Sequence, residues 1–216
     1  LPGTSKAVLT LANGQMIPLG EEAADSTIIT DGTQINASGS GVTYASNGES
    51  GSIVYNKLEI PRGGEFCLTL SDGTKVWLNS ETSIQYPVAF GAKERRVFVQ
   101  GEAYFEVAKD VKKPFTVQFM SSSVTVLGTS FNIRAYPEEK QSQTTLAEGS
   151  VRIYSPGSSM LLKPGEQAEV NVLSGEMVKK EVEVKSFTSW KDGRFVFEQQ
   201  PLEDIMRTLE RWYDIR

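Results

Sequence analysis

The sequence predicts an all-β protein: an antiparallel two-sheet sandwich or short β roll, followed by a C-terminal strand–helix element. Short stretches of alternating apolar and polar residues recur along the 216 residues, and such alternation is the pattern of strands with one buried face. Turn dipeptides separate these stretches: Asn13-Gly14, Asp31-Gly32, Asp72-Gly73, Ser174-Gly175 and Asp192-Gly193. Asn-Gly and Asp-Gly accept the positive φ angles of tight hairpin turns, so these dipeptides favour antiparallel pairing.

One hairpin pattern occurs twice. Residues 9–14 read Leu-Thr-Leu-Ala-Asn-Gly and residues 68–73 read Leu-Thr-Leu-Ser-Asp-Gly, with apolar residues at the same offsets around the turn. Repetition of one supersecondary unit favours a sandwich or a short solenoid. Between the copies, residues 20–55 are rich in Gly, Ser, Thr, Asn and Asp and predict only short strands, near 27–29 and 42–44.

The alternation becomes more regular after residue 57. It predicts strands at 58–60, 83–86, 96–100, 102–107, 115–119, 123–127, 131–136, 144–147, 150–154, 160–163, 167–173 and 177–184. Around residue 186 the pattern changes again. We therefore expect N-terminal β hairpins with a polar loop over 1–56, a β domain over 57–185, and the start of a further module over 186–216.

The last part of the chain predicts a strand and then a helix. Trp190, Phe195 and Phe197 alternate loosely around Asp192-Gly193, which suggests the strand. Pro201 suits the first turn of a helix. Apolar residues at spacings of three and four then form a stripe: Leu202, Ile205, Met206, Leu209 and Trp212.

This apolar face needs a cover, which could be the β core, a further part of the module or a partner protein. Packing within the chain is the commoner outcome. As candidate partner-binding residues we select Trp190, Phe195, Phe197, Leu209 and Trp212.

Composition excludes several function classes. With 22 Lys and Arg against 27 Asp and Glu, the net charge is -5, and no uninterrupted basic run is present, so direct nucleic-acid binding is not expected. The chain has no histidine, which removes histidine metal sites and the commonest general base. The single cysteine, Cys67, lies between Phe66 and Leu68 and is expected to be a buried, inert thiol. We expect no enzymatic activity, no metal and no cofactor.

Two further features have an ordinary interpretation and a functional one. Glu102 and Glu106 share one face of a predicted strand about 13 Å apart, wider than the separation used in glycoside hydrolysis, so a solvated face is expected. Trp77 falls between Val76 and Leu78 and should lie on the outer face of its sheet. Packing on a neighbouring strand is the favoured interpretation, and a stacking platform in a surface glycan-binding module is the alternative.

Several collinear segments together resemble the FecR family of bacterial transmembrane anti-sigma regulators. They are Leu70–Asn79, Ser83–Pro87, Arg95–Val107, Lys113–Val117, Val126–Asn132, Thr144–Val151 and Leu162–Gln167. Residues 190–197, 201–206 and 211–214 are also similar to the start of the C-terminal module of these regulators, which is related to a signalling domain of outer-membrane receptors.

The resemblance implies a periplasmic region of a single-pass inner-membrane protein. Such regulators hold an extracytoplasmic-function sigma factor through a cytoplasmic segment and contact the signalling domain of a TonB-dependent outer-membrane receptor in the periplasm. Both the cytoplasmic segment and the membrane helix are expected upstream of this chain. The implied function is therefore to pass a signal from the receptor to the sigma factor.

Overall fold

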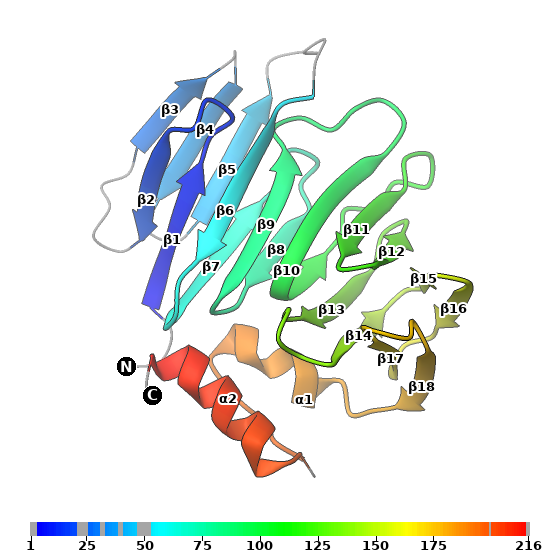
Figure 1. The fold of residues 1–216 in the computed structure, drawn as a ribbon. Coiled ribbons are helices and arrows are strands. Elements are labelled where there is room, and N and C mark those ends of the chain that lie inside the picture. Colours follow the sequence, from blue (N-terminus) through cyan, green and yellow to red (C-terminus); the bar gives the residue numbers. More distant parts are fainter. Residues whose placement is uncertain are drawn as a thin grey trace.

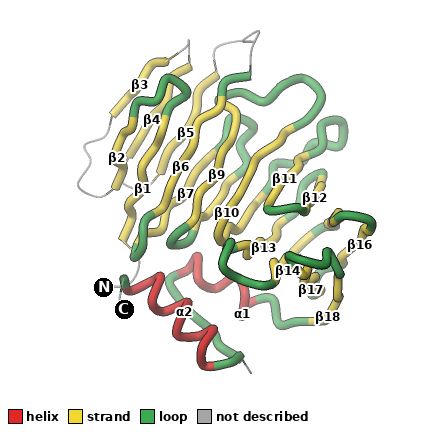
Figure 2. Tube along the Cα trace, in the orientation of Figure 1, coloured by secondary structure: helices red, strands yellow, loops and turns green. Residues whose placement is uncertain are grey.

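The chain folds as a strand-rich body with helices at one end (Figure 1). The computed structural model describes residues 4–20, 26–30, 33–38, 41–46, 53–198 and 200–214, in which 18 strands form one hydrogen-bonded network. Figure 2 shows the helices gathered beneath the strands, at the end where both chain termini lie. The predicted all-β class and the C-terminal helix are therefore confirmed. Asp31-Gly32 and residues 47–52, most of the loop expected over 45–52, fall outside the described residues, whereas residues 45 and 46 belong to a strand.

Strand pairing defines two sheets. In spatial order the first sheet contains β2 (Met16–Gly20), β1 (Thr4–Thr10), β6 (Tyr55–Ile60), β9 (Thr82–Pro87), β10 (Arg95–Glu106), β11 (Phe115–Phe119), β12 (Ser122–Val126), β15 (Val151–Ser155) and β16 (Ser158–Leu162). The second contains β3 (Ser26–Thr30), β4 (Thr33–Ser38), β5 (Gly41–Ser46), β7 (Gly64–Thr69), β8 (Lys75–Leu78), β10 again, β13 (Ser130–Ala135), β14 (Gln141–Glu148), β17 (Glu166–Asn171) and β18 (Met177–Glu181).

The long strand β10 joins the two sheets. Its first half pairs with β9 and β11 in the first sheet, and its second half pairs with β8 and β13 in the second. Gly101 lies at the crossing with a φ of 106°, and a Cβ there would stand 2.4 Å from Thr82 Oγ1. Only glycine lets β10 approach β9 this closely at the point where β10 passes from one sheet to the other.

The sheets also meet along β1, so the predicted two-sheet sandwich is correct only in part. Because β1 pairs with β6 in one sheet and in parallel with β7 in the other, the strands β1, β6, β9, β10, β8 and β7 close into a six-strand barrel. Beyond β10 the two sheets continue as facing layers. Pairing is antiparallel except in β1–β7, β5–β7 and β10–β11 among the described strands.

The two predicted hairpin copies have the same turn. Gly14 N–H donates to Leu11 O at 2.9 Å, and Gly73 N–H donates to Leu70 O at 3.0 Å. Both glycines have positive φ, 85° and 84° respectively. The first copy joins β1 to β2 in the first sheet, and the second joins β7 to β8 in the second, so the repeat contributes one hairpin to each layer.

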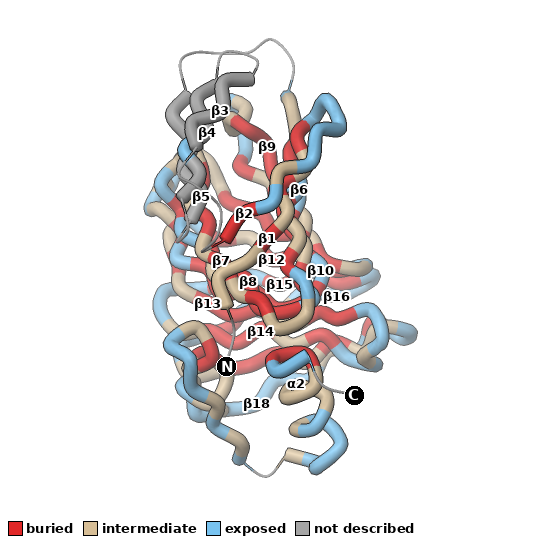
Figure 3. Tube along the Cα trace, turned by 90° about the vertical axis from the view of Figure 1, so that its left-hand side faces the viewer, coloured by how far each residue is buried: buried red, intermediate tan, exposed pale blue. Residues whose placement is uncertain are grey.

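The core lies between the two layers and inside the barrel, where Figure 3 shows buried strands surrounded by exposed turns. Buried side chains from both layers form one cluster, which includes Leu9, Leu58, Leu68, Val76, Ile84, Val97, Phe105, Phe115, Val124, Phe131, Leu146 and Ile153. The rings of Phe105 and Phe131 stack at 5.1 Å across β10 and β13. Each fully buried side chain of this kind contributes about 1.5–3 kcal/mol by leaving water.

The C-terminal part contains α1 (Lys185–Thr188), the short 3-10 helix η1 (Ser189–Asp192) and α2 (Leu202–Tyr213). The predicted helix is α2, but the predicted strand is wrong, because residues 193–198 form no regular element. Gly193, with a φ of 71°, ends η1 in the left-handed conformation. The same conformation ends helices and closes hairpins, so the Asp-Gly pair alone could not separate the two. None of the helices described is both long and apolar enough to cross a bilayer.

Candidate functional site

The junction between the sheets and the C-terminal segments is organised around the carboxylate of Glu102. The side chain of Glu102, on β10, is only 7% exposed, which overturns the solvated-face expectation for this residue, whereas Glu106 is exposed as expected. The carboxylate oxygens of Glu102 accept hydrogen bonds from Asn79 Nδ2 at 3.0 Å and Asn132 Nδ2 at 3.1 Å. Arg134 Nη1 lies 3.4 Å from the same carboxylate. A buried charge requires this degree of compensation.

Asn132 connects that carboxylate to η1. Its Oδ1 accepts a hydrogen bond from the indole Nε1 of Trp190 at 3.1 Å, and Trp190 is buried against the second sheet. One side-chain amide thus donates to Glu102 and accepts from Trp190. This arrangement fixes both the amide orientation and the position of η1 across β13.

Trp77 lies on the outer face of the same sheet, as predicted. Its ring meets the ring of Tyr104 edge-on at 5.8 Å. Lys191 Nζ, from η1, is 5.7 Å from the Trp77 centroid and 5.3 Å from that of Tyr104. Because a neighbouring aromatic ring and a lysine from η1 already pack on Trp77, the structure disfavours this residue as a glycan platform.

Arg211 anchors the C-terminal end of α2 and is only 6% exposed. Its guanidinium pairs with Glu138, with Glu139 at 3.1 Å and with Glu81 at 3.4 Å. The same group lies 3.8 Å from the centroid of the Tyr136 ring. Three carboxylates and one aromatic face therefore surround this single cation, so α2 is held through its last turn.

The two parts of the junction are connected through Arg134. Its guanidinium donates to Glu139 through Nε at 3.0 Å and Nη2 at 2.6 Å while also facing Glu102. Burial lowers the pKa of Arg134, but Glu102 and Glu139 outweigh burial and raise it overall. The chain of contacts runs from Glu102 through Arg134 and Glu139 to Arg211.

Burial and the nearby charges also shift the pKa values of Tyr136 and Glu138. Burial, followed by the charge of Glu102, raises the pKa of Tyr136, so its hydroxyl stays protonated and donates to Ser80 O at 2.8 Å. Burial raises the pKa of Glu138, but hydrogen bonds from its own backbone and from Arg211 outweigh burial and lower it overall. The cluster is therefore suited to hold segments together by charge.

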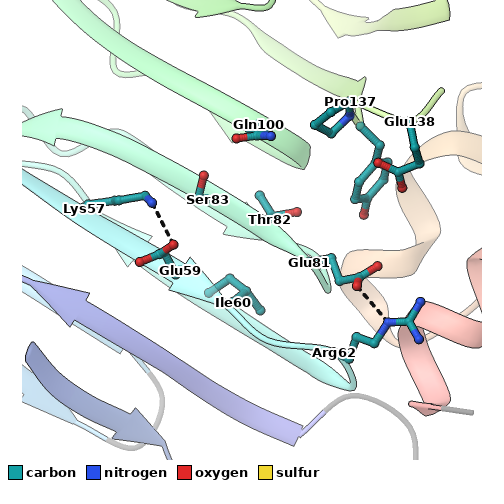
Figure 4. Close-up of a pocket in the computed structure, with 11 residues that line it drawn as sticks. Lys57, Glu59, Ile60, Arg62, Glu81, Thr82, Ser83, Gln100, Pro137 and Glu138 are labelled. Atoms are coloured by element: carbon teal, nitrogen blue, oxygen red, sulfur yellow. Dashed lines mark hydrogen bonds and ion pairs between the residues drawn. The ribbon is translucent and has the colours of Figure 1, made fainter. Parts of the chain in front are cut away.

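A shallow groove of about 500 Å³ lies beside this anchorage (Figure 4). Its floor is the outer face of β6, β9 and β10, and its far wall is shared with the α2 anchorage through Arg62, Glu81, Tyr136 and Glu138. Arg62 Nε donates to Glu81 at 2.7 Å. The lining is polar and carries both charge signs, and two of its residues, Glu81 and Glu138, belong to the ion pairs of Arg211.

The predicted partner-binding residues separate into two groups. Phe195 and Phe197 stack at 5.9 Å, and Phe195 meets Trp212 edge-on at 4.8 Å, so these three come together beside α2. Trp190 contacts Asn132 instead, and both tryptophans are buried. Leu209 is half-buried.

Several important residues could not be selected from the sequence. The most exposed apolar side chains of α2 are Leu202, at 72%, and Tyr213 and Met206, at 45% and 44%. Leu202 and Met206 belonged to the predicted stripe, but nothing showed which of its members face solvent. Arg211 and Asn132 carried no pattern of their own, because their roles depend on partners 72 and 58 residues away.

Comparison with known proteins agrees with this architecture. Residues 56–152 match the family described as FecR protein, and residues 194–216 match the family described as FecR, C-terminal. Among curated proteins no match was found.

Two crystal structures of a proposed anti-sigma factor from Parabacteroides distasonis ATCC 8503 share the fold. The structure at 2.50 Å resolution is 37% identical, with a TM-score of 0.71 and coverage of 74% of this chain and 75% of that one. The structure at 1.65 Å resolution is also 37% identical, with a TM-score of 0.70 and coverage of 73% and 74%. On this evidence of sequence, fold and extent together, the chain belongs to the FecR family of anti-sigma-factor-like regulators.

Proposed function

We propose that this chain is the periplasmic relay region of a transmembrane anti-sigma regulator. In this proposal it receives a signal from the signalling domain of a TonB-dependent outer-membrane receptor. An upstream membrane helix and cytoplasmic segment then pass the signal to an extracytoplasmic-function sigma factor. The chain acts through protein contacts and performs no chemical reaction.

The observation that supports this function most directly is the surface of α2. This helix belongs to the segment that matches the FecR C-terminal family, and it exposes Leu202, Met206 and Tyr213. They lie at positions i, i+4 and i+11, on one side of the helix. An exposed apolar stripe beside the charged residues of the same helix is typical of a protein-interaction surface.

The anchorage of α2 gives this surface a fixed position. Arg211 and Trp212 are buried at its C-terminal end, whereas its N-terminal turn projects into solvent. Phe195 and Phe197 support the same end through Trp212. We propose that Trp190, Phe195, Phe197, Leu209 and Trp212 organise this receptor-facing module from below, and that Leu202 and Met206 make the contact.

The proposed division of the chain follows from these roles. Residues 186–216 form the start of the receptor-facing module, and residues 57–185 form the FecR-like β domain. Residues 1–56 supply the N-terminal hairpins and a polar loop. Strand β1 of this part pairs with β6. This division stays a prediction.

A sigma-dependent reporter in cells that carry the full-length regulator and its receptor tests the proposal. Met206→Glu and Leu209→Glu place a charge on the apolar side of α2 and should abolish the inducer-dependent response, with normal regulator levels. Arg207→Glu, on the exposed polar side, is the matched control and should respond normally. A normal response from both apolar-side variants would contradict the proposal.

A further inference from the structure

We propose that the turn between β6 and β7, residues 61–64, couples the docking of α2 to the order of the first residues of β1. This coupling goes beyond the proposed function, because it concerns the internal mechanics of the chain and requires no partner. The two described ends of the chain lie next to each other at this turn, as Figure 1 shows. The turn is therefore placed to transmit a change at one end to the other.

Gly63 bonds to both ends of the chain through its own backbone. Its N–H donates to Arg211 O, in the last turn of α2, at 2.7 Å. Its carbonyl accepts from Thr4 N–H at 3.0 Å and lies 3.4 Å from Thr4 Oγ1. The backbone of Gly63 thus forms one hydrogen bond with the end of α2 and another with the start of β1.

A side chain of the same turn reinforces the connection. Arg62 and Arg211 both pair with the carboxylate of Glu81, at 2.7 Å and 3.4 Å. Movement of Arg211 away from this cluster therefore changes the charge balance at Arg62 as well. The turn is linked to α2 by both its backbone and its side chain.

The first residues of β1 depend on this turn more than the rest of the strand. Thr4 and Ser5 pair with Gly64 and Glu65 of β7, whereas from Lys6 onward β1 pairs with β2 and, from Val8, with β6. A Cβ at Gly64 would stand 3.0 Å from Lys6 Cγ and 3.1 Å from Lys6 O. The turn is in close contact with Lys6, so the first residues of β1 cannot keep their position if the turn shifts.

Docking of α2 has the features of a reversible contact. Its stabilising charges are partly open to water, since Glu138 is 55% exposed and Glu81 is 35% exposed. The apolar side chain of Leu202 contributes little to the docking, because it is 72% exposed. Segments held in this way open locally at lower free energy than core strands.

Two consequences follow from this arrangement. Release of α2 removes the bond from Gly63 N–H and one counter-ion from Glu81, and the first residues of β1 then lose order. Thermodynamic linkage requires the reverse effect as well, so weakening the bond at Thr4 should loosen α2.

Residue-resolved amide hydrogen exchange of the chain, followed by NMR, tests both directions. Arg211→Ala should increase exchange about tenfold or more in α2, at Gly63 and at residues 4–6, a coupling within the usual range. Exchange in β10 and β13 should stay at the wild-type level. Arg207→Ala is the matched control, because Arg207 is an exposed arginine of the same helix whose pairs, with Glu203 and Asp204, lie within α2.

The reciprocal variant is Thr4→Pro, which removes the donor to Gly63 at the first position of a strand, where proline is tolerated. It should increase exchange at residues 205–210 of α2 without affecting β10 and β13. Release of α2 in Arg211→Ala with unchanged exchange at residues 4–6 would overturn the proposal. So would an unchanged α2 in Thr4→Pro, or equal acceleration throughout the core in either variant. These outcomes are independent of the reporter experiment, which uses the receptor and the sigma factor.

Discussion

Replacing Glu102 by glutamine gives the most direct test of the junction. The substitution keeps the size of the side chain and removes its charge. Glu102 accepts from Asn79 and Arg134 on one oxygen and from Asn132 on the other. The introduced amide has one acceptor and one donor group, so in either orientation a donor faces a donor.

The cost can be worked out from these contacts. In the better orientation the introduced carbonyl still accepts the hydrogen bonds from Asn79 and Arg134, and the hydrogen bond from Asn132 is lost. Hydrogen bonds to charged groups contribute about 1.5–3 kcal/mol each, and a buried unpaired donor adds about 1–3 kcal/mol. Since the remaining bonds also become weaker, we expect Glu102→Gln to lower the free energy of unfolding by about 3 kcal/mol. For a chain of this length that is a decrease in Tm of about 6–12 °C.

Chemical and thermal denaturation of both glutamate variants measures this effect. Glu106→Gln, four residues further along the same face of β10, is the matched control, because its side chain is exposed. It should stay within about 0.5 kcal/mol of wild type. The indole N–H resonance of Trp190 should shift only in Glu102→Gln, since Asn132 orients that group. Equal stability of the two variants would refute the role given to Glu102.

Three further predictions concern other parts of the structure. Because docking lowers the pKa of Glu138 below its ordinary value of about 4.3, its pairing with Arg211 persists at neutral pH and is lost as the pH falls through the lowered pKa, so exchange in α2 should rise in acid; Glu138→Gln should weaken this pH dependence. Gly101→Ala should cost more than about 3 kcal/mol because its Cβ would overlap β9, whereas Gly73→Ala, also at positive φ but in open space, should cost about 1–2 kcal/mol by thermal denaturation. Burial raises the pKa of the half-buried Cys67, so alkylation at about pH 7.5 should be slower than that of free cysteine.

Local chemistry explains why much of the fold could be predicted. Asn13-Gly14 and Asp72-Gly73 form the hairpins that their φ preferences indicate. The spacing of Leu202, Met206 and Leu209 correctly predicts α2. These features depend on residues close in sequence, and so the sequence alone contains the information.

The incorrect expectations involve partners far away in the chain. Glu102 has the alternation of a solvated strand face, yet β10 crosses between sheets just before it and brings Asn132 and Arg134 beside it. Cys67 was expected to be buried but is half-buried on the outer face, next to Trp77. Alternation separates two faces of a strand, but tertiary packing decides how far each face is covered.

The C-terminal segments are held at this junction by a network of charged and polar side chains, and such a network holds a segment differently from apolar packing. Both C-terminal contacts trace back to Glu102, through Asn132 to Trp190 in η1 and through Arg134 and Glu139 to Arg211 in α2. Well-packed apolar residues of similar volume would often bind these segments as tightly or more tightly. A hydrogen-bonded charge network fixes direction and register instead, and it loses its stabilisation abruptly when one member leaves. The relay proposed above needs a segment that is held in one position and can still detach, and a charge network meets both needs better than tight apolar packing does.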